Sequence, residues 1–127
     1  MSVGSISAQF QKTLFQSFEL SDTINSLNLE LSGTVQIESW VGSAILIETK
    51  VEMDNGNATL FKFLQETGRY LIEEVRVDST LVVRSKFKER PIVGNQYGNI
   101  SEVVNLKVLL PDSYILADST RWVKKKE

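Results

Sequence analysis

The sequence predicts a mainly β protein, an antiparallel β-sandwich or meander with one short α-helix at about residues 58–67. Residues 27–53 alternate apolar and polar side chains with only two glycine-centred interruptions, and this period is typical of half-buried strands. A second clean alternation ends at Pro111. Between these two stretches, at about residues 58–67, apolar residues recur at helical spacing. A short β-helix-like roll is the alternative architecture, because the strand pattern does not specify how strands stack.

The first two strands are expected at residues 13–20 and 27–31, separated by the turn signal Ser21-Asp22. In both, apolar residues occupy alternate positions and should face the core. These residues are Leu14, Phe18, Leu20, Leu27, Leu29 and Leu31.

Two glycine-containing loops then determine the expected register. As three-residue loops, they pair Leu31 with Val35 and Ile37 with Ile47, which keeps apolar residues on one face. A two-residue loop would mix polar and apolar residues on that face. The pattern therefore favours an antiparallel meander, although strands that change sheet at these glycines fit as well.

The next strand, residues 45–53, is expected to place Ile45, Ile47, Val51 and Met53 in the core and Glu48, Lys50 and Glu52 in solvent. A helix should follow, since Asn57 is a good N-cap and Gly68 a good C′ residue.

Strands are expected again at residues 70–77 and 81–87, and residues 86–99 read as a long loop because they contain Pro91 and two glycines. The last long strand ends at Pro111, and a short strand is expected at 114–116. The residues expected on the core-facing side of the long strand are Val104, Leu106, Val108 and Leu110.

The 127 residues fit one domain. We expect an N-terminal arm at 1–11, a β-rich domain at 12–118 and a basic tail without a strand period at 119–127. The sequence as written shows no signal peptide and no membrane-spanning run. This favours a virion or cytoplasmic assembly, or the cell surface if a signal was removed.

The chain has neither cysteine nor histidine, so the commonest general base, the best nucleophile and the commonest transition-metal ligand are absent. We expect no enzyme activity, no cofactor and no metal site. Glu73 and Glu74 could form part of a carboxylate pair, but acidic residues here are interspersed with lysine, as on a solvated strand face. A net charge of −2 does not favour contact with nucleic acid.

The segments Gly33-Thr-Val-Gln-Ile-Glu-Ser-Trp40 and Val104-Asn-Leu-Lys-Val-Leu-Leu-Pro111, with the strand and helix between them, resemble a family. It is the adhesin-like, β-rich domain family of unknown function, of the putative auto-transporter adhesin type. The resemblance covers about residues 27–116 and implies a β scaffold in a surface or structural role. Members of that family usually carry a secretion signal and continue into further β repeats, which this chain does not show.

Two aromatic residues and one basic series are candidate partner-binding residues. Trp40 is expected on the face opposite Val35 and Ile37, either as an exposed anchor or as a cover for one end of the sheet. Tyr97 lies at a glycine-flanked loop tip. Arg84, Lys86, Lys88 and Arg90 alternate toward the long loop and could contact an acidic partner, although a solvated strand explains them equally well.

The leading hypothesis is a non-catalytic structural or interaction protein. It would self-associate as a homo-oligomer or decorate a larger assembly, such as a virion capsid, a virion tail or a surface layer. The alternative is an adhesin-like module that binds carbohydrate or a surface through Trp40 or Tyr97.

Overall fold

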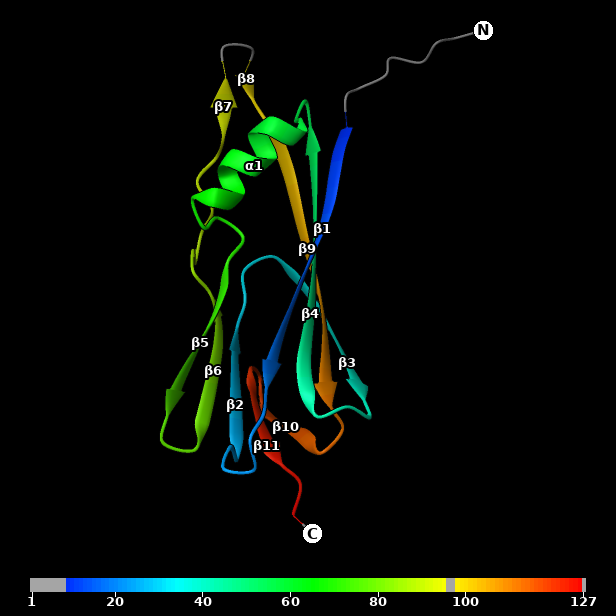
Figure 1. Ribbon diagram of the computed structural model, residues 1–127, viewed down its shortest axis with the longest axis vertical. Coiled ribbons are helices and arrows are strands. Elements are labelled where there is room, and N and C mark those ends of the chain that lie inside the picture. The colour runs from blue at the N-terminus through cyan, green and yellow to red at the C-terminus, as the bar shows by residue number, and fades with distance from the viewer. Residues whose placement is uncertain (1–8, 96–97, 127) are drawn as a thin grey trace, which may run out of the picture.

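The computed structural model describes residues 9–95 and 98–126, whose elements are labelled in Figure 1. Their bounds are β1 (Gln9–Glu19), β2 (Ser26–Glu30), β3 (Thr34–Trp40), β4 (Ala44–Asp54), α1 (Ala58–Glu66), β5 (Ile72–Val77), β6 (Thr80–Ser85), β7 (Gly94–Asn95), β8 (Gly98–Asn99), β9 (Ser101–Pro111), β10 (Tyr114–Asp118) and β11 (Arg121–Lys124). The protein is mainly β with one short helix, which confirms the predicted class.

The strands form two mixed sheets. The long sheet has the order β1-β4-β9-β3, the short sheet has the order β10-β11-β2-β6-β5, and β7 pairs with β8 in a separate hairpin. Most neighbours are antiparallel, but β3 is parallel to β9 and β2 is parallel to β6. The sandwich-like fold is therefore confirmed and the purely antiparallel arrangement is wrong, because the parallel pairs join strands far apart in the chain.

A single hydrophobic core lies between the two sheets, and α1 lies beside the upper part of the long sheet, beyond the short sheet (Figure 1). Phe61 of α1 packs there with ring centroids 5.3 Å from both Phe10 and Tyr70. The core-facing residues expected in β2, β4 and β9 are buried, namely Leu27, Leu29, Ile45, Ile47, Val51, Met53, Val104, Leu106, Val108 and Leu110. Each fully buried aliphatic side chain contributes roughly 1.5–3 kcal/mol.

The expected hairpin between β2 and β3 is wrong, because the chain changes sheet at Gly33. This is the alternative that the sequence also allowed. Gly33 has φ +123°, and a Cβ there would lie 2.8 Å from the Val104 carbonyl oxygen, so both backbone and space require glycine. Leu31 follows the end of β2 and Val35 lies in β3 of the other sheet, so the two residues are not cross-strand partners.

The expected pairing of β3 with β4 is also wrong, although the faces are right. Ile37 is opposite Val108 of β9, and Val108 is opposite Ile47 of β4. The predicted partners Ile37 and Ile47 therefore lie on the same face of the sheet, but β9 lies between their strands. The sequence did not predict this because a parallel neighbour from late in the chain leaves no local signal.

The helix begins and ends where its caps predict. The Asn57 side chain accepts a hydrogen bond from the Leu60 N–H at 2.8 Å, and Thr67 is the C-cap. Gly68 follows with φ +84°, the left-handed conformation of a C′ glycine.

Both predicted end segments contain strand. β1 begins at Gln9, inside the arm expected at 1–11, because it pairs with β4 along its whole length. The tail expected at 119–127 contains β11, in which Trp122 lies opposite Leu27 of β2, so pairing within the sheet overrides the weak local pattern. Among the described residues, no helix has the length and apolarity needed to cross a membrane.

Candidate functional site

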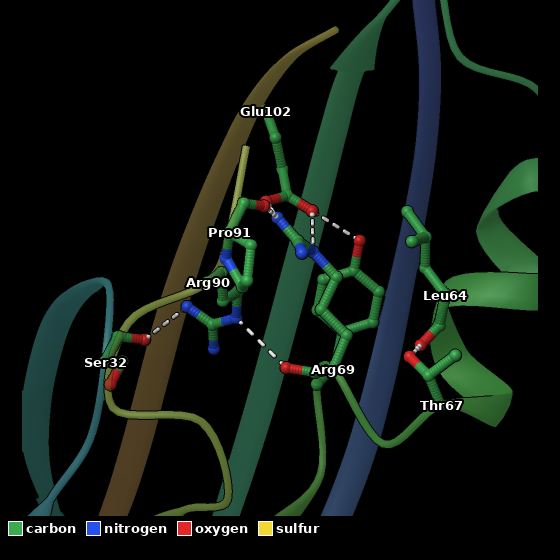
Figure 2. Close-up of polar contacts among 8 residues, drawn as sticks. Ser32, Leu64, Thr67, Arg69, Arg90, Pro91 and Glu102 are labelled. Carbon is green, nitrogen blue, oxygen red and sulfur yellow. Dashed lines mark hydrogen bonds and ion pairs between the residues drawn. The ribbon is translucent and has the colours of Figure 1, made fainter. Parts of the chain in front are cut away.

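A buried ionic cluster lies where the chain leaves α1 and meets β9 (Figure 2). Arg69 donates from Nε to Glu102 Oε2 at 3.1 Å and from Nη2 to Glu102 Oε1 at 2.8 Å. Arg69 Nη2 also donates to the Pro91 carbonyl oxygen at 2.6 Å, and the Tyr70 hydroxyl donates to Glu102 Oε2. Arg69 and Tyr70 are only 7% and 3% exposed, so these bonds are shielded from water.

The cluster shifts the pKa values of its members. Burial by itself would raise the pKa of Glu102, but the hydrogen bonds from Arg69 and Tyr70 and the charge of Arg69 outweigh it and lower that pKa. Burial and the hydrogen bond to Glu102 raise the pKa of Tyr70. At neutral pH the carboxylate is therefore charged and the phenol is protonated, which is the combination that the observed hydrogen bonds need.

The sequence contains a signal for this cluster that our interpretation missed. Glu102 lies opposite Met53, so it continues the core-facing series of β9 that begins at Val104. A carboxylate at a core-facing position requires a buried cationic or hydrogen-bonding partner. Arg69 and Tyr70 directly follow the glycine that ends α1, but nothing in their local pattern indicates that they meet β9.

This cluster fastens the fold and offers no open reactive group. The carboxylate oxygens of Glu102 already accept bonds from Arg69 and Tyr70, and Arg69 is almost fully covered. Within residues 9–95 and 98–126, no group of three or more Asp, Glu, His or Cys side chains could hold a metal ion.

The predicted basic series does not form one surface. β6 ends at Ser85, so only Arg84 of the series is in the strand. Its Nη2 lies 3.9 Å from Glu73 Oε2. Lys86 and Lys88 are exposed in the loop that follows.

Arg90 turns inward instead. Its Nε donates to the Arg69 carbonyl oxygen at 3.2 Å, its Nη1 donates to the Ser32 carbonyl oxygen at 3.0 Å, and its guanidinium lies 5.9 Å from the Tyr70 ring centroid (Figure 2). Two of its nitrogens thus hold loops together, which fits a structural role better than a partner contact.

Trp40 lies on the outer face of the long sheet, as predicted, but its indole contacts the turn between β3 and β4. Its Nε1 donates to the Ala44 carbonyl oxygen at 2.9 Å. A Cβ on Gly42 would lie 2.1 Å from the Trp40 ring, so the ring covers this glycine closely. Trp40 therefore packs over the turn between β3 and β4. Tyr97, the other aromatic candidate, lies outside the described residues.

A shallow hollow of about 390 Å³ opens on the outer face of the long sheet. Phe15, which is 76% exposed, lies at this hollow with Leu46 and Leu109, and Glu48 and Lys107 add one charge of each sign. This patch has apolar area but no arrangement of polar groups that would orient a particular ligand.

The edges of the two sheets differ in how they are protected against pairing with another strand. β1 has Lys12 opposite the buried Val51, which places an exposed charge on its core-facing side. In β5, Glu74 and Arg76 lie opposite the buried Val83 and Leu81, so this strand also has charges on its core-facing side. β10 is short and has a register shift after Leu116. Inward charges, short strands and bulges are devices that natural sheets use to prevent edge pairing.

β3 has none of these devices. Val35 and Ile37 lie on its core-facing side, opposite Leu106 and Val108, and are still 36% and 37% exposed. Its one charged residue, Glu38, is on the outer face, 3.5 Å from Lys107. The expectation that Val35 and Ile37 face inward is thus right in direction, but at this edge no described residue covers them fully.

The free side of β3 also presents unpaired peptide groups. The Trp40 carbonyl oxygen accepts the Asp112 N–H at 2.8 Å, so the even-numbered residues of β3 direct their peptide groups toward β9. Because this direction alternates along a strand, Val35, Ile37 and Ser39 direct their peptide groups away from β9, toward the free edge of the sheet. Within the described part of the chain, β3 has β9 as its only neighbour in the sheet.

Together, the free backbone groups and the half-exposed apolar side chains make the β3 edge the candidate functional site. Comparison of the chain with protein-family models, with curated proteins and with solved structures found no match. The resemblance to adhesin-like domains therefore stays a prediction, and the functional argument depends on the geometry of this edge.

Proposed function

We propose that this chain is a non-catalytic structural or interaction protein whose β3 edge pairs with an extended strand of a partner. In this role it self-associates or decorates a larger assembly, such as a virion or a surface layer. The observation that carries the proposal is that β3 combines outward peptide groups with half-exposed Val35 and Ile37, while the other sheet edges are protected.

Strand addition would satisfy both features of this edge at once. A partner strand would accept hydrogen bonds from the free N–H groups of Val35, Ile37 and Ser39 and donate hydrogen bonds to their free carbonyl oxygens. Each bond would make a net contribution of about 0.5–1.5 kcal/mol. Its side chains on the core-facing side would also cover the exposed parts of Val35 and Ile37. Backbone bonds supply affinity in this mode and side-chain contacts supply selectivity.

The alternative, a carbohydrate- or surface-binding module, depends on Trp40 and Tyr97. The Trp40 N–H and part of its ring are used within the β3–β4 turn. Stacking on a sugar needs a free aromatic face, so the described geometry supports strand pairing better.

The proposal can be tested with a synthetic peptide of alternating valine and threonine, N-methylated along one edge so that it can pair on its other edge only. We expect titration to slow amide exchange at Val35, Ile37 and Ser39, measured residue by residue by NMR. A peptide methylated along both edges is the matched control and should leave these amides unchanged.

Ile37→Lys provides the second arm, because it gives β3 the inward charge that Lys12 gives β1. This variant should lose the peptide-induced protection while keeping its circular dichroism spectrum. The titration uses a sample dilute enough for the chain to be monomeric, so that the β3 edge is free. In that sample, protection at β1 or β10 instead of β3, or no protection at any edge, would contradict the proposal.

A further inference from the structure

We infer that the strand which occupies the β3 edge is β3 of a second copy, paired antiparallel about a two-fold axis at Ile37. This inference rests on the proposed function and names its partner. The result would be one continuous sheet in which the two long sheets join edge to edge.

The orientation follows from the faces of β3. A two-fold axis perpendicular to the sheet makes the two strands antiparallel and keeps both core-facing sides on the same side of the joined sheet. Ile37 then lies against Ile37 of the second copy. A parallel pair related by a two-fold axis along the strands would put this apolar side beside the polar outer side of the other copy.

The register follows from the free peptide groups. An axis at Ile37 pairs Ile37 with Ile37 and Val35 with Ser39 of the second copy. Every residue of β3 whose peptide groups point away from β9 then gains a partner. An axis at Gln36 pairs only Val35 with Ile37. An axis at Glu38 would place two carboxylates directly opposite each other, which is destabilising.

Hydrogen-bond complementarity on the outer face supports the same register. With the axis at Ile37, Gln36 lies opposite Glu38 of the second copy, so an amide meets a carboxylate twice. Within one chain these side chains already interact, since Gln36 Nε2 donates to Glu38 Oε1 at 3.1 Å. Lys107, 3.5 Å from Glu38, supplies a compensating positive charge.

The short sheet adds apolar surface to the same side of the sandwich. Gln16 of β1 bonds to Ile72 of β5 with both ends of its amide, so β1 and β5 form one side and β3 and β10 form the other. Leu116 of β10 faces inward, opposite Trp122, and is 56% exposed. The side that would meet the second copy is therefore apolar in both layers, whereas the opposite side carries the inward charges of β1 and β5.

The first test is the molar mass of the intact chain by light scattering over a range of concentrations. We expect a dimer that dissociates on dilution. Ile37→Lys should shift it to monomer, whereas the control Val77→Lys, at an exposed position on the outer face of β5, should not. A wild-type monomer at every concentration would overturn the inference.

The second test uses single cysteines, which are unambiguous because the chain has none of its own. Directly opposed residues in a hydrogen-bonded antiparallel pair have Cα atoms about 5.5 Å apart, within the range of disulfides. Ile37→Cys should therefore form a disulfide-linked dimer under mild oxidation, whereas Gln36→Cys should stay largely monomeric. Preferential linkage through Gln36→Cys would overturn the register.

A charge exchange tests self-pairing with substitutions on the solvent-exposed face, which should not affect folding. Gln36→Glu places like charges opposite each other twice and should weaken the dimer by on the order of tenfold. Adding Glu38→Gln restores an amide opposite each carboxylate and should restore the affinity. No weakening, or no restoration, would count against the second copy as partner.

The two proposals can fail separately. A chain that stays monomeric but shows peptide-induced protection at β3 retains the proposed function and loses this inference. A dimer that Ile37→Lys leaves intact uses a different surface and contradicts the inference.

Discussion

Arg69 and Glu102 form a two-pronged ion pair, with Nε and Nη2 of the guanidinium donating to separate carboxylate oxygens at 3.1 and 2.8 Å. The two residues are far apart in the sequence and join the segment after α1 to the start of β9. Because both are largely buried, the pair stabilises the fold only while both partners are present.

Removal of one partner should therefore be costly. We expect Glu102→Ala to lower the free energy of unfolding by about 3–5 kcal/mol, because it leaves the buried Arg69 charge without a counter-charge. Urea denaturation measures this. Glu52→Ala is the control, since it breaks the partly exposed Lys50–Glu52 pair and should cost less than about 1 kcal/mol.

The double variant Arg69→Met with Glu102→Leu tests the explanation. Replacing both charges with apolar side chains should recover much of the lost stability, because no unpaired charge remains. A double variant as unstable as Glu102→Ala would show that the packing and hydrogen bonds around Arg69, and not its unpaired charge, determine the loss of stability.

The same cluster predicts a loss of stability in acid. The folded-state pKa of Glu102 is lowered from its ordinary value of 4.5, so its contribution is present above that pH and is lost as the pH falls through the folded-state pKa. The difference in unfolding free energy between wild type and Glu102→Gln should therefore shrink below about pH 4.5. A difference that is constant across this range would contradict the assignment.

At the alkaline end the sign is reversed. The folded-state pKa of Tyr70 is raised from its ordinary value of 10.0, so the protonated phenol stabilises the fold below that pH and this contribution is lost above it. Tyr70→Phe should flatten the fall in stability above about pH 10, measured by thermal unfolding. Tyr114→Phe serves as a comparison, because Tyr114 is also buried but its hydroxyl donates to the Ile24 carbonyl oxygen and not to a carboxylate.

Trp40 should prove to be a structural residue. Trp40→Phe keeps a ring over Gly42 but loses the hydrogen bond to Ala44, so we expect a loss of about 0.5–1.5 kcal/mol. Gly42→Ala should also destabilise, because its Cβ would overlap the Trp40 ring. Stability equal to wild type in both variants would leave Trp40 free for a binding role.

The helix cap gives a smaller, local effect. Asn57→Ala removes the acceptor for the Leu60 N–H and should cost about 1 kcal/mol. Asn57→Asp keeps a side-chain oxygen at the cap and should remain close to wild type in thermal unfolding.

Local patterns predicted much of this fold. The alternation in β4 and β9 identified which residues face the core, and the caps of α1 placed the helix to within a residue. Both signals depend on neighbours along the chain, where the backbone geometry of a strand or helix is repeated. The candidate site is different, because the exposure of Val35 and Ile37 depends on what covers β3.

The sequence by itself determined most of the strands, the helix and the core-facing side of β1, β2, β3, β4 and β9, because the positions of apolar residues repeat with the period of the backbone. It did not indicate β7, β8 or β11. Only the tertiary structure decided that β9 lies between β3 and β4, that Arg69 meets Glu102, and that β3 is an edge. These are contacts between distant segments. They depend on which strands pair to bury the whole core, and no single segment carries that information.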